Sequence, residues 1–180
     1  MSFIESLRRR ARQRTRRVVF PEATEPRVLR AVEILQREGL ILPVLVGVRG
    51  EINRAAHAAL LVLPQVEIVE PQSYRALPRW VEKYNAGNAA RGLNKKIEET
   101  TLREPLAFAA AYVAAGEADA LVAGSVHSTS EVLRAALQFI GLQEGCKLVS
   151  SAFAMVAPNT NRVFTYADCA VVPDPNAEQL

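Results

Sequence analysis

Short apolar runs alternate with stretches of helical periodicity over the first 70 residues. Three of the runs have the length and composition of buried strands and lie at 18–20, 41–46 and 66–69. The segment between the first two has apolar residues at helical spacing, a proline suited to a first turn and a glycine suited to a helix end: Val28, Leu29, Val32, Leu35, Pro26 and Gly39. Residues 51–63 form another helical segment. This alternation predicts a parallel sheet, because parallel neighbours need a crossover connection.

The pattern changes after a long helical region at 73–115, which ends at Gly116. Next come a predicted buried strand, a polar turn and a helix, at 119–124, 125–130 and 131–140. Two further apolar runs, at 148–156 and 163–166, are separated by turn-forming residues. They predict an antiparallel hairpin.

These elements predict an α/β protein with three layers, α/β/α, around a mainly parallel sheet. We expect residues 1–146 to form a first α/β domain with a basic N-terminal helix. Residues 147–180 are then the start of a second domain, entered through the hairpin. Asn176 is suited to cap a helix, but only four residues follow it. A helix cut within its first turn is an unusual ending, so we expect the sequence to represent part of a larger protein.

Composition and charge narrow the function classes. The 180 residues are 49% hydrophobic and 23% charged, which is typical of a soluble globular protein and excludes a disordered or collagen-like chain. Seven arginines fall within residues 1–17, so the net charge of +3 hides a slightly acidic remainder. Nucleic-acid-binding surfaces usually spread basic residues over a face with aromatic residues between them. We therefore expect a solvated helix face and no nucleic-acid partner, with a basic-tailed binding module or a transit peptide as open alternatives.

Several features that the sequence lacks shape our expectations about cellular location and bound cofactors. No uncharged stretch is long enough to span a bilayer, and the N-terminus has no apolar block before a cleavage site, so neither a membrane nor secretion is expected. Cys146 and Cys169 are isolated and suit a reducing cytoplasm. Neither His57 nor His127 has a second ligand at metal-binding spacing, so no metal site is expected. The common glycine-rich nucleotide loops are also absent.

The turn before residue 131 concentrates polar groups where a strand delivers the chain to a helix. Ser128, Thr129 and Ser130 supply hydroxyl groups, and Arg134 lies one helical turn beyond Ser130. Free backbone N–H groups and the positive end of a helix favour an anion at such a place, phosphate above all. The alternative is that a serine only caps the helix and Arg134 lies on the surface.

Several stretches of the chain resemble a known family. They occur in the family's order and at its approximate spacing, at 17–22, 26–29, 116–124, 127–130, 133–134, 149–153, 166–170, 173–175 and 177–180. The family is that of the phosphate acetyltransferases and phosphate butyryltransferases. The resemblance covers nearly the whole chain but only about the first half of the family's catalytic region.

The resemblance implies a two-domain α/β/α enzyme, similar in fold to the isocitrate and isopropylmalate dehydrogenases, with its site between the domains. It implies reversible acyl transfer between acetyl phosphate and coenzyme A, with coenzyme A as a substrate, no cofactor and a homodimer. Residues matched to phosphate or substrate binding are Arg134, Arg27, His127, Ser128, Thr129 and Ser130. Asp168 is a possible cleft residue. The catalytic residues are expected in a half that follows, so the 180 residues alone are expected to be inactive.

The match has one local departure and leaves two family readings open. The family often has a basic stretch before the alanine-rich helix, whereas this chain has residues 82–87 there and Arg91 beyond them. A phosphate butyryltransferase remains possible, because each methylene changes pocket preference by only about 1–3 kcal/mol. A non-catalytic, acetyl-CoA-sensing domain of a malic enzyme-type fusion is the other alternative.

Overall fold

The computed structural model describes residues 2–63, 66–90, 96–158, 160, 162–167, 171–172 and 176–177. The chain divides into two compact units. The larger is Arg14–Ile140, and the smaller combines Met1–Gln13 with Gly141–Leu180. The domain boundary expected after residue 146 stays a prediction.

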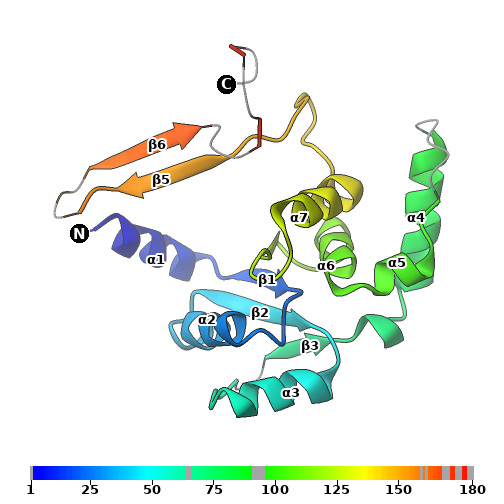
Figure 1. Ribbon diagram of the computed structural model, residues 1–180, viewed down its shortest axis with the longest axis horizontal. Coiled ribbons are helices and arrows are strands. Elements are labelled where there is room, and N and C mark those ends of the chain that lie inside the picture. The colour runs from blue at the N-terminus through cyan, green and yellow to red at the C-terminus, as the bar shows by residue number, and fades with distance from the viewer. Residues whose placement is uncertain are drawn as a thin grey trace. The chain divides into compact units, whose positions relative to one another are not determined.

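A four-stranded parallel sheet organises the larger unit (Figure 1). Its spatial order is β3-β2-β1-β4. The strands are β1 (Arg16–Phe20), β2 (Ile41–Val46), β3 (Glu67–Val69) and β4 (Ala120–Leu121). The predicted mainly parallel α/β fold is confirmed.

Helices cover both faces of this sheet (Figure 1). They are α2 (Pro26–Arg37), α3 (Arg49–Ala58), α4 (Leu77–Ala90), α5 (Glu99–Arg103), α6 (Pro105–Ala114) and α7 (Thr129–Ala135), with a 3₁₀ turn η1 (Pro71–Ser73) and a π-helical turn η2 (Ala136–Ile140). Because successive side chains of a strand point to opposite faces of the sheet, β1 contributes to two separate hydrophobic cores. In β1, Val18 and Phe20 pack with α2 and α3, whereas Val19 packs with α6.

Helix α2 shows how local sequence positions the chain after β1. Glu25 lies at the N-cap and accepts a hydrogen bond from the backbone N–H of Arg27, while Pro26 occupies the first turn. Leu29 and Val32 are fully buried. This burial fixes the loop between β1 and α2 against the sheet.

Two predicted elements differ from the observed ones. The strand expected to be buried at 119–124 is only β4, which lies at the edge of the sheet with Val122 54% exposed. An edge strand has a neighbour on one flank only, which its apolar composition does not reveal. The helix expected at 131–140 is split, because α7 gives way to the π-helical turn η2.

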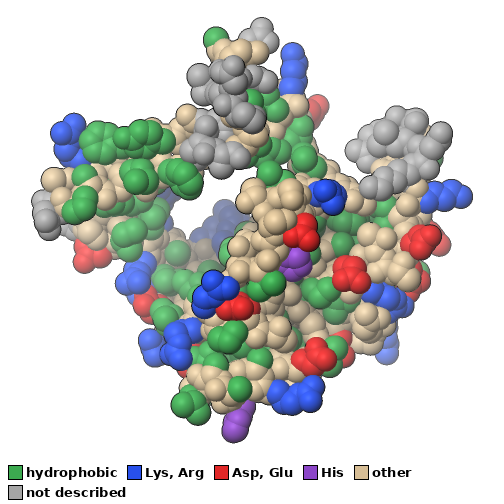
Figure 2. Space-filling model, viewed as in Figure 1, with side chains coloured by type: hydrophobic (Ala, Val, Ile, Leu, Met, Phe, Trp, Pro, Cys, Tyr) green, Lys and Arg blue, Asp and Glu red, His purple; other side chains and the backbone are tan. Residues whose placement is uncertain are grey.

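The smaller unit contains α1 (Phe3–Gln13) and an antiparallel hairpin of β5 (Ala152–Val156) and β6 (Val163–Ala167). The predicted hairpin is confirmed. One of its faces carries four exposed large side chains, Phe153, Met155, Phe164 and Tyr166, and hydrophobic groups gather over the hairpin in Figure 2. Among the described residues, no helix is both long and apolar enough to cross a bilayer.

Candidate functional site

The sheet order creates a natural binding position between β1 and β4. The chain moves outward from β1 to β2 and β3, and then returns to place β4 on the other flank of β1. In open α/β sheets, ligands bind beyond the carboxyl ends of the strands at such a switch point. The loop after β1 carries Glu22, and the loop after β4 carries His127. Both loops therefore meet at this switch point, beyond the carboxyl ends of β1 and β4.

Glu22 joins the two loops through its carboxylate. Its side chain is only 2% exposed. Its oxygens accept hydrogen bonds from the backbone N–H groups of four successive residues, at 3.2, 2.8, 2.9 and 2.8 Å: Gly124, Ser125, Val126 and His127. Glu22 Oε1 also lies 2.8 Å from Nδ1 of the His127 ring. This buried carboxylate therefore determines the shape of the turn after β4.

The same contacts control protonation. Burial raises the pKa of Glu22, but the backbone N–H groups of His127, Val126 and Ser125, together with the His127 ring, outweigh burial and lower it to about 2. At neutral pH the carboxylate is ionised and can only accept hydrogen bonds. Nδ1 of His127 must then carry a proton. Nε2 is left as the ring nitrogen available to a ligand.

A second carboxylate occupies the start of α7. Ser128 and Glu131 form a reciprocal capping box, in which Ser128 Oγ accepts from the Glu131 N–H and Glu131 Oε2 accepts from the Ser128 N–H at 2.7 Å. The Ser128 hydroxyl also donates to Glu131 at 2.6 Å. These contacts lower the pKa of Glu131, with smaller contributions from nearby His127 and Arg134.

This arrangement changes how an anion could be bound. The sequence led us to expect free backbone N–H groups at this turn. Those of residues 124–128 and of Glu131 are instead taken by the carboxylates of Glu22 and Glu131 and by Ser128. Cationic side chains must therefore provide much of the attraction for an anion here.

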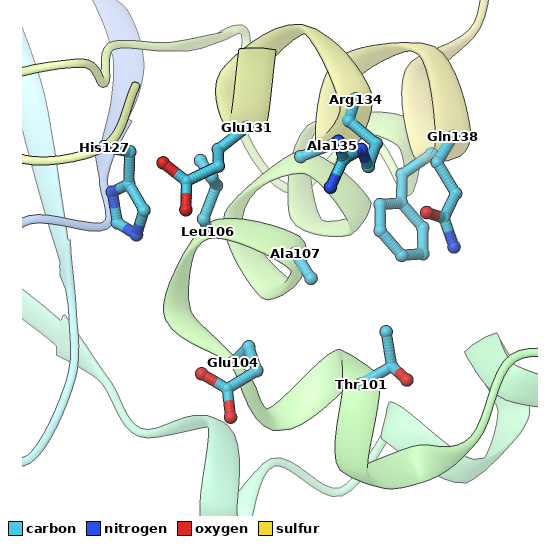
Figure 3. A pocket seen from close by; sticks show the side chains of 10 residues that line it. Thr101, Glu104, Leu106, Ala107, His127, Glu131, Arg134, Ala135 and Gln138 are labelled. Carbon is cyan, nitrogen blue, oxygen red and sulfur yellow. The ribbon is translucent and has the colours of Figure 1, made fainter. Parts of the chain in front are cut away.

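A cavity of about 310 Å³ opens beside α7 within the larger unit (Figure 3). Its walls come from α5, α6, α7 and the π-helical turn. They include Thr101, Glu104, His127, Glu131, Arg134 and Gln138. The Arg134 guanidinium points into this space in Figure 3, and His127 lies at the other end of the same wall. The structure thus brings together two of the residues predicted from the sequence.

Arg134 is exposed and accessible to a ligand. In the part of the chain that the structure describes, its guanidinium has no hydrogen bond or ion pair, although its charge acts on Glu131. A guanidinium offers five N–H donors in a planar fork that matches the oxygens of a phosphate. Its presence on the cavity wall gives the site a cation for an anionic ligand.

The other predicted site residues are dispersed. Arg27 lines a separate cavity of about 160 Å³ near Phe20 and Val122, and its guanidinium donates to the Ser125 carbonyl at 3.0 Å and pairs with Glu25 at 2.6 Å. Ser130 Oγ lies 3.0 Å from the Ser128 hydroxyl, and Thr129 is exposed at the first position of α7. Asp168, Cys169 and Arg91 lie outside the described residues.

Sequence reasoning missed two residues that organise the site. Glu131 follows Ser128 by three positions, which is the spacing of a capping box and could have been recognised. Glu22 lies in one of the stretches that carry the family resemblance, but its pairing with residues about 100 positions away has no local signal. Only the parallel pairing of β1 with β4 brings the two loops together.

Comparison with known proteins identifies the family. A family model described as "Phosphate acetyl/butaryl transferase" matches residues 2–180. The chain belongs to this family. It is 36% identical over 184 residues to the phosphate acetyltransferase of Thermoanaerobacterium thermosaccharolyticum, covering 100% of the chain and 56% of that protein. It is 38% identical over 172 residues to the phosphate acetyltransferase of Pseudomonas aeruginosa, covering 95% of the chain and 24% of that protein.

Solved structures of phosphotransacetylases share this fold. One from Streptococcus pyogenes matches with a TM-score of 0.88 and 28% identity, over 99% of this chain and 55% of that one. The EutD phosphotransacetylase from Staphylococcus aureus has a TM-score of 0.84 at 24% identity, over 98% and 52% of the two chains, and supports the fold alone. The resemblance drawn from the sequence is confirmed. The chain spans about half the length of several of these family members.

Proposed function

We propose that this chain supplies the phosphate-binding part of a phosphate acetyltransferase, which transfers an acetyl group reversibly between acetyl phosphate and coenzyme A. The observation that carries the proposal is the Arg134 guanidinium, which has no acceptor among the described residues and points into a cavity shared with His127. The family match and the phosphate acetyltransferase relatives supply the reaction class.

The chemistry of the cavity suits the phosphate end of acetyl phosphate. Arg134 offers a bidentate donor to two phosphate oxygens. Nε2 of His127 offers one more polar contact, and the apolar side chains of Leu106, Ala107 and Phe139 contribute to the walls. Glu104 and Glu131 place negative charge in the same cavity, so the ligand's position must favour the arginine over these carboxylates.

Both reactants must be held together with a base for the thiol of coenzyme A. We propose that this base, the remaining catalytic groups and part of the coenzyme A site come from a second half such as the relatives possess. Arg27, Ser128, Thr129 and Ser130 stay candidates for contacts with substrate, and Asp168 for the cleft. Coenzyme A acts as a substrate, and no metal or other cofactor is included in the proposal.

The proposal extends to the setting of the enzyme. We infer a homodimer in the cytoplasm, a location suited to an exposed free thiol such as that of Cys146. Neither nucleic acid nor a membrane is included among its partners. No specific observation favours butyryl transfer or an acetyl-CoA-sensing role over acetyl transfer.

The test joins these 180 residues to the C-terminal part of the T. thermosaccharolyticum enzyme. Formation of acetyl-CoA from acetyl phosphate and coenzyme A is followed in this fusion, in the 180-residue chain and in the isolated C-terminal part. We expect turnover by the fusion only, with butyryl phosphate used less well. A folded fusion that forms no acetyl-CoA would contradict the proposal. Equal turnover by the 180-residue chain would show that the acid–base groups lie within it.

A further inference from the structure

The Glu22–His127 pair has a geometry that phosphate binding alone does not require. Glu22 is one of only two buried polar or charged residues among the described ones, the other being Asn88. It comes from the loop after β1, whereas His127 comes from the loop after β4. The carboxylate contacts the His127 backbone N–H and ring Nδ1, both at 2.8 Å. The ring is therefore held at two points by one buried group.

This double contact fixes which ring nitrogen meets the ligand. Because Glu22 can accept but not donate, the neutral ring carries its proton on Nδ1. The His127 side chain is 31% exposed and lines the cavity that also contains Arg134. Nε2 is consequently directed to solvent and cavity, where it accepts a proton when the ring is neutral and donates one when the ring is charged. A carboxylate that orients a histidine in this way is a recurring device for proton transfer.

We propose that His127 transfers the proton of the phosphate group during acyl transfer and that Glu22 is its positioning residue. The inference rests on the proposed function and adds a proton donor to its phosphate site. Arg134 is the anchor for the phosphate, and His127 handles the proton that the phosphate gains or loses.

In the direction of acetyl-CoA formation, the thiol gives its proton to a base from the second half, and the carbon–sulfur bond forms as the carbon–oxygen bond to phosphate breaks. The departing phosphate oxygen takes the Nε2 proton of the His127 imidazolium and leaves as hydrogen phosphate. Solvent returns the proton from the base to His127. In reverse, neutral Nε2 accepts the proton of hydrogen phosphate.

Charged groups reach the surroundings of His127 from several elements. Glu22 faces Nδ1 from the loop after β1, Glu131 and Arg134 act from α7, and Glu104 lies on the same cavity at the start of α6. The pH profile of the reaction therefore depends on all four groups, and the test compares variants in the same background.

The sharpest test replaces His127 with residues that each keep one of its two polar ends. In the fusion enzyme, His127→Asn keeps a donor near the Nδ1 position for Glu22 but removes Nε2. His127→Gln carries its amide nearer the Nε2 position. We expect His127→Asn to lower kcat by roughly 100-fold with a smaller change in KM, and to abolish one limb of the pH–rate profile. The matched control His57→Asn changes an exposed histidine on α3 and should leave all three readouts unchanged.

The outcomes separate the proton-transfer role from a structural one. If His127 only holds the turn, His127→Asn should retain kcat within about threefold and keep both limbs of the profile, while His127→Gln should be the weaker enzyme. That result would overturn the proposal. Lack of activity in the unmodified fusion would instead contradict the proposed function. The contact between Glu22 and the His127 ring can then still be tested by NMR, which needs no enzyme activity.

Ring nitrogens can be observed directly in the 180-residue chain. The sequence has only two histidines, so His57→Gln leaves His127 as the single imidazole. Nitrogen-15 NMR of the neutral ring should show the proton on Nδ1, and the additional substitution Glu22→Gln should move the population toward the Nε2-protonated form. A neutral ring already protonated on Nε2 in the presence of Glu22 would overturn the proposal.

Discussion

The two ends of the parallel sheet use charge in different ways. At the amino end, Arg16 pairs with Asp119 at 2.5 Å, and Arg17 pairs with Glu67 at 3.0 Å and donates to the Tyr112 hydroxyl at 3.2 Å. Asp119 also accepts the Arg17 backbone N–H at 2.8 Å. Both guanidiniums at this end therefore have acceptors within the protein.

The carboxyl end combines complete and incomplete pairing. Glu22 accepts from four backbone N–H groups and the His127 ring, which leaves Nε2 of that ring for another partner. Arg134 has no acceptor among the described residues. Groups paired within the protein stabilise the fold, whereas a cation and a ring nitrogen facing a cavity are available for a ligand. The carboxyl end therefore combines a structural carboxylate with polar groups that a ligand can reach, whereas Arg16 and Arg17 at the amino end are both paired within the protein.

The largest effect should follow loss of the cavity cation. In the fusion enzyme, Arg134→Ala should lower kcat/KM by roughly 10- to 150-fold, since a hydrogen bond to a charged group contributes about 1.5–3 kcal/mol. Arg134→Lys should recover part of the loss, because it restores charge without the bidentate fork. Steady-state kinetics decide this, with Arg79→Ala on the exposed side of α4 as the matched control. Values for Arg134→Ala within twofold of wild type would remove this residue from the site.

Loss of the buried carboxylate should destabilise the chain more than loss of a carboxylate at the amino end. Glu22→Ala removes the acceptor shared by the part-buried N–H groups of residues 124–127, and a single hydrogen bond to a charged group contributes about 1.5–3 kcal/mol. Glu67→Ala breaks a partly exposed pair worth roughly 0.2–1 kcal/mol. Urea unfolding of the two variants measures the difference. Equal losses would mean that the Glu22 contacts contribute little.

Urea unfolding at acid pH should show how much the ionised Glu22 carboxylate stabilises the chain. Its pKa is lowered from 4.5 to about 2 in the folded chain, so its stabilisation is complete above pH 4.5 and is lost as the pH falls toward 2. Glu22→Gln cannot lose this contribution. The stability difference between wild type and Glu22→Gln should therefore shrink between pH 6 and pH 3. A difference that stays constant over this range would contradict the lowered pKa.

The smallest effect is expected at the amino end. Arg17→Ala should reduce the free energy of unfolding by roughly 1 kcal/mol or less, because its ion pair is partly exposed to solvent. Its kcat/KM in the fusion enzyme should equal that of wild type. A tenfold loss of kcat/KM with little loss of stability would place a residue needed for activity at the amino end of the sheet and contradict the proposed site.

The elements most accessible to sequence reasoning were those with strong local patterns. The apolar runs of β1, β2 and β3, the helix after Pro26 and the hairpin were all predicted within a few residues, because burial and turn chemistry leave local signals. The predicted end of the third helical segment, at residue 63, lies beyond the observed end of α3 at Ala58. The chain leaves the helix with Leu60 in a left-handed conformation at φ 55°, a conformation that leucine does not indicate.

The site was only partly predictable for a physical reason. Arg134 and His127 were predicted as site residues because they follow a strand and a turn in sequence, and the structure places both on one cavity. The expected backbone anion site was wrong in its detail, since the carboxylate that fills it comes from the loop after β1. No local pattern links Glu22 to residues about 100 positions later. That link depends on the strand order.

Phosphate titration of the nitrogen-15-labelled chain tests the central claim most directly. The side-chain resonances of Arg134 and His127 are followed together with those of Arg17 and His57 as inorganic phosphate is added at constant ionic strength. We expect saturable shifts at Arg134 and His127, absent in Arg134→Ala, with Arg17 and His57 unchanged. Shifts confined to the arginines of α1 or to Arg17, or none at Arg134, would contradict a phosphate site at the carboxyl end of the sheet.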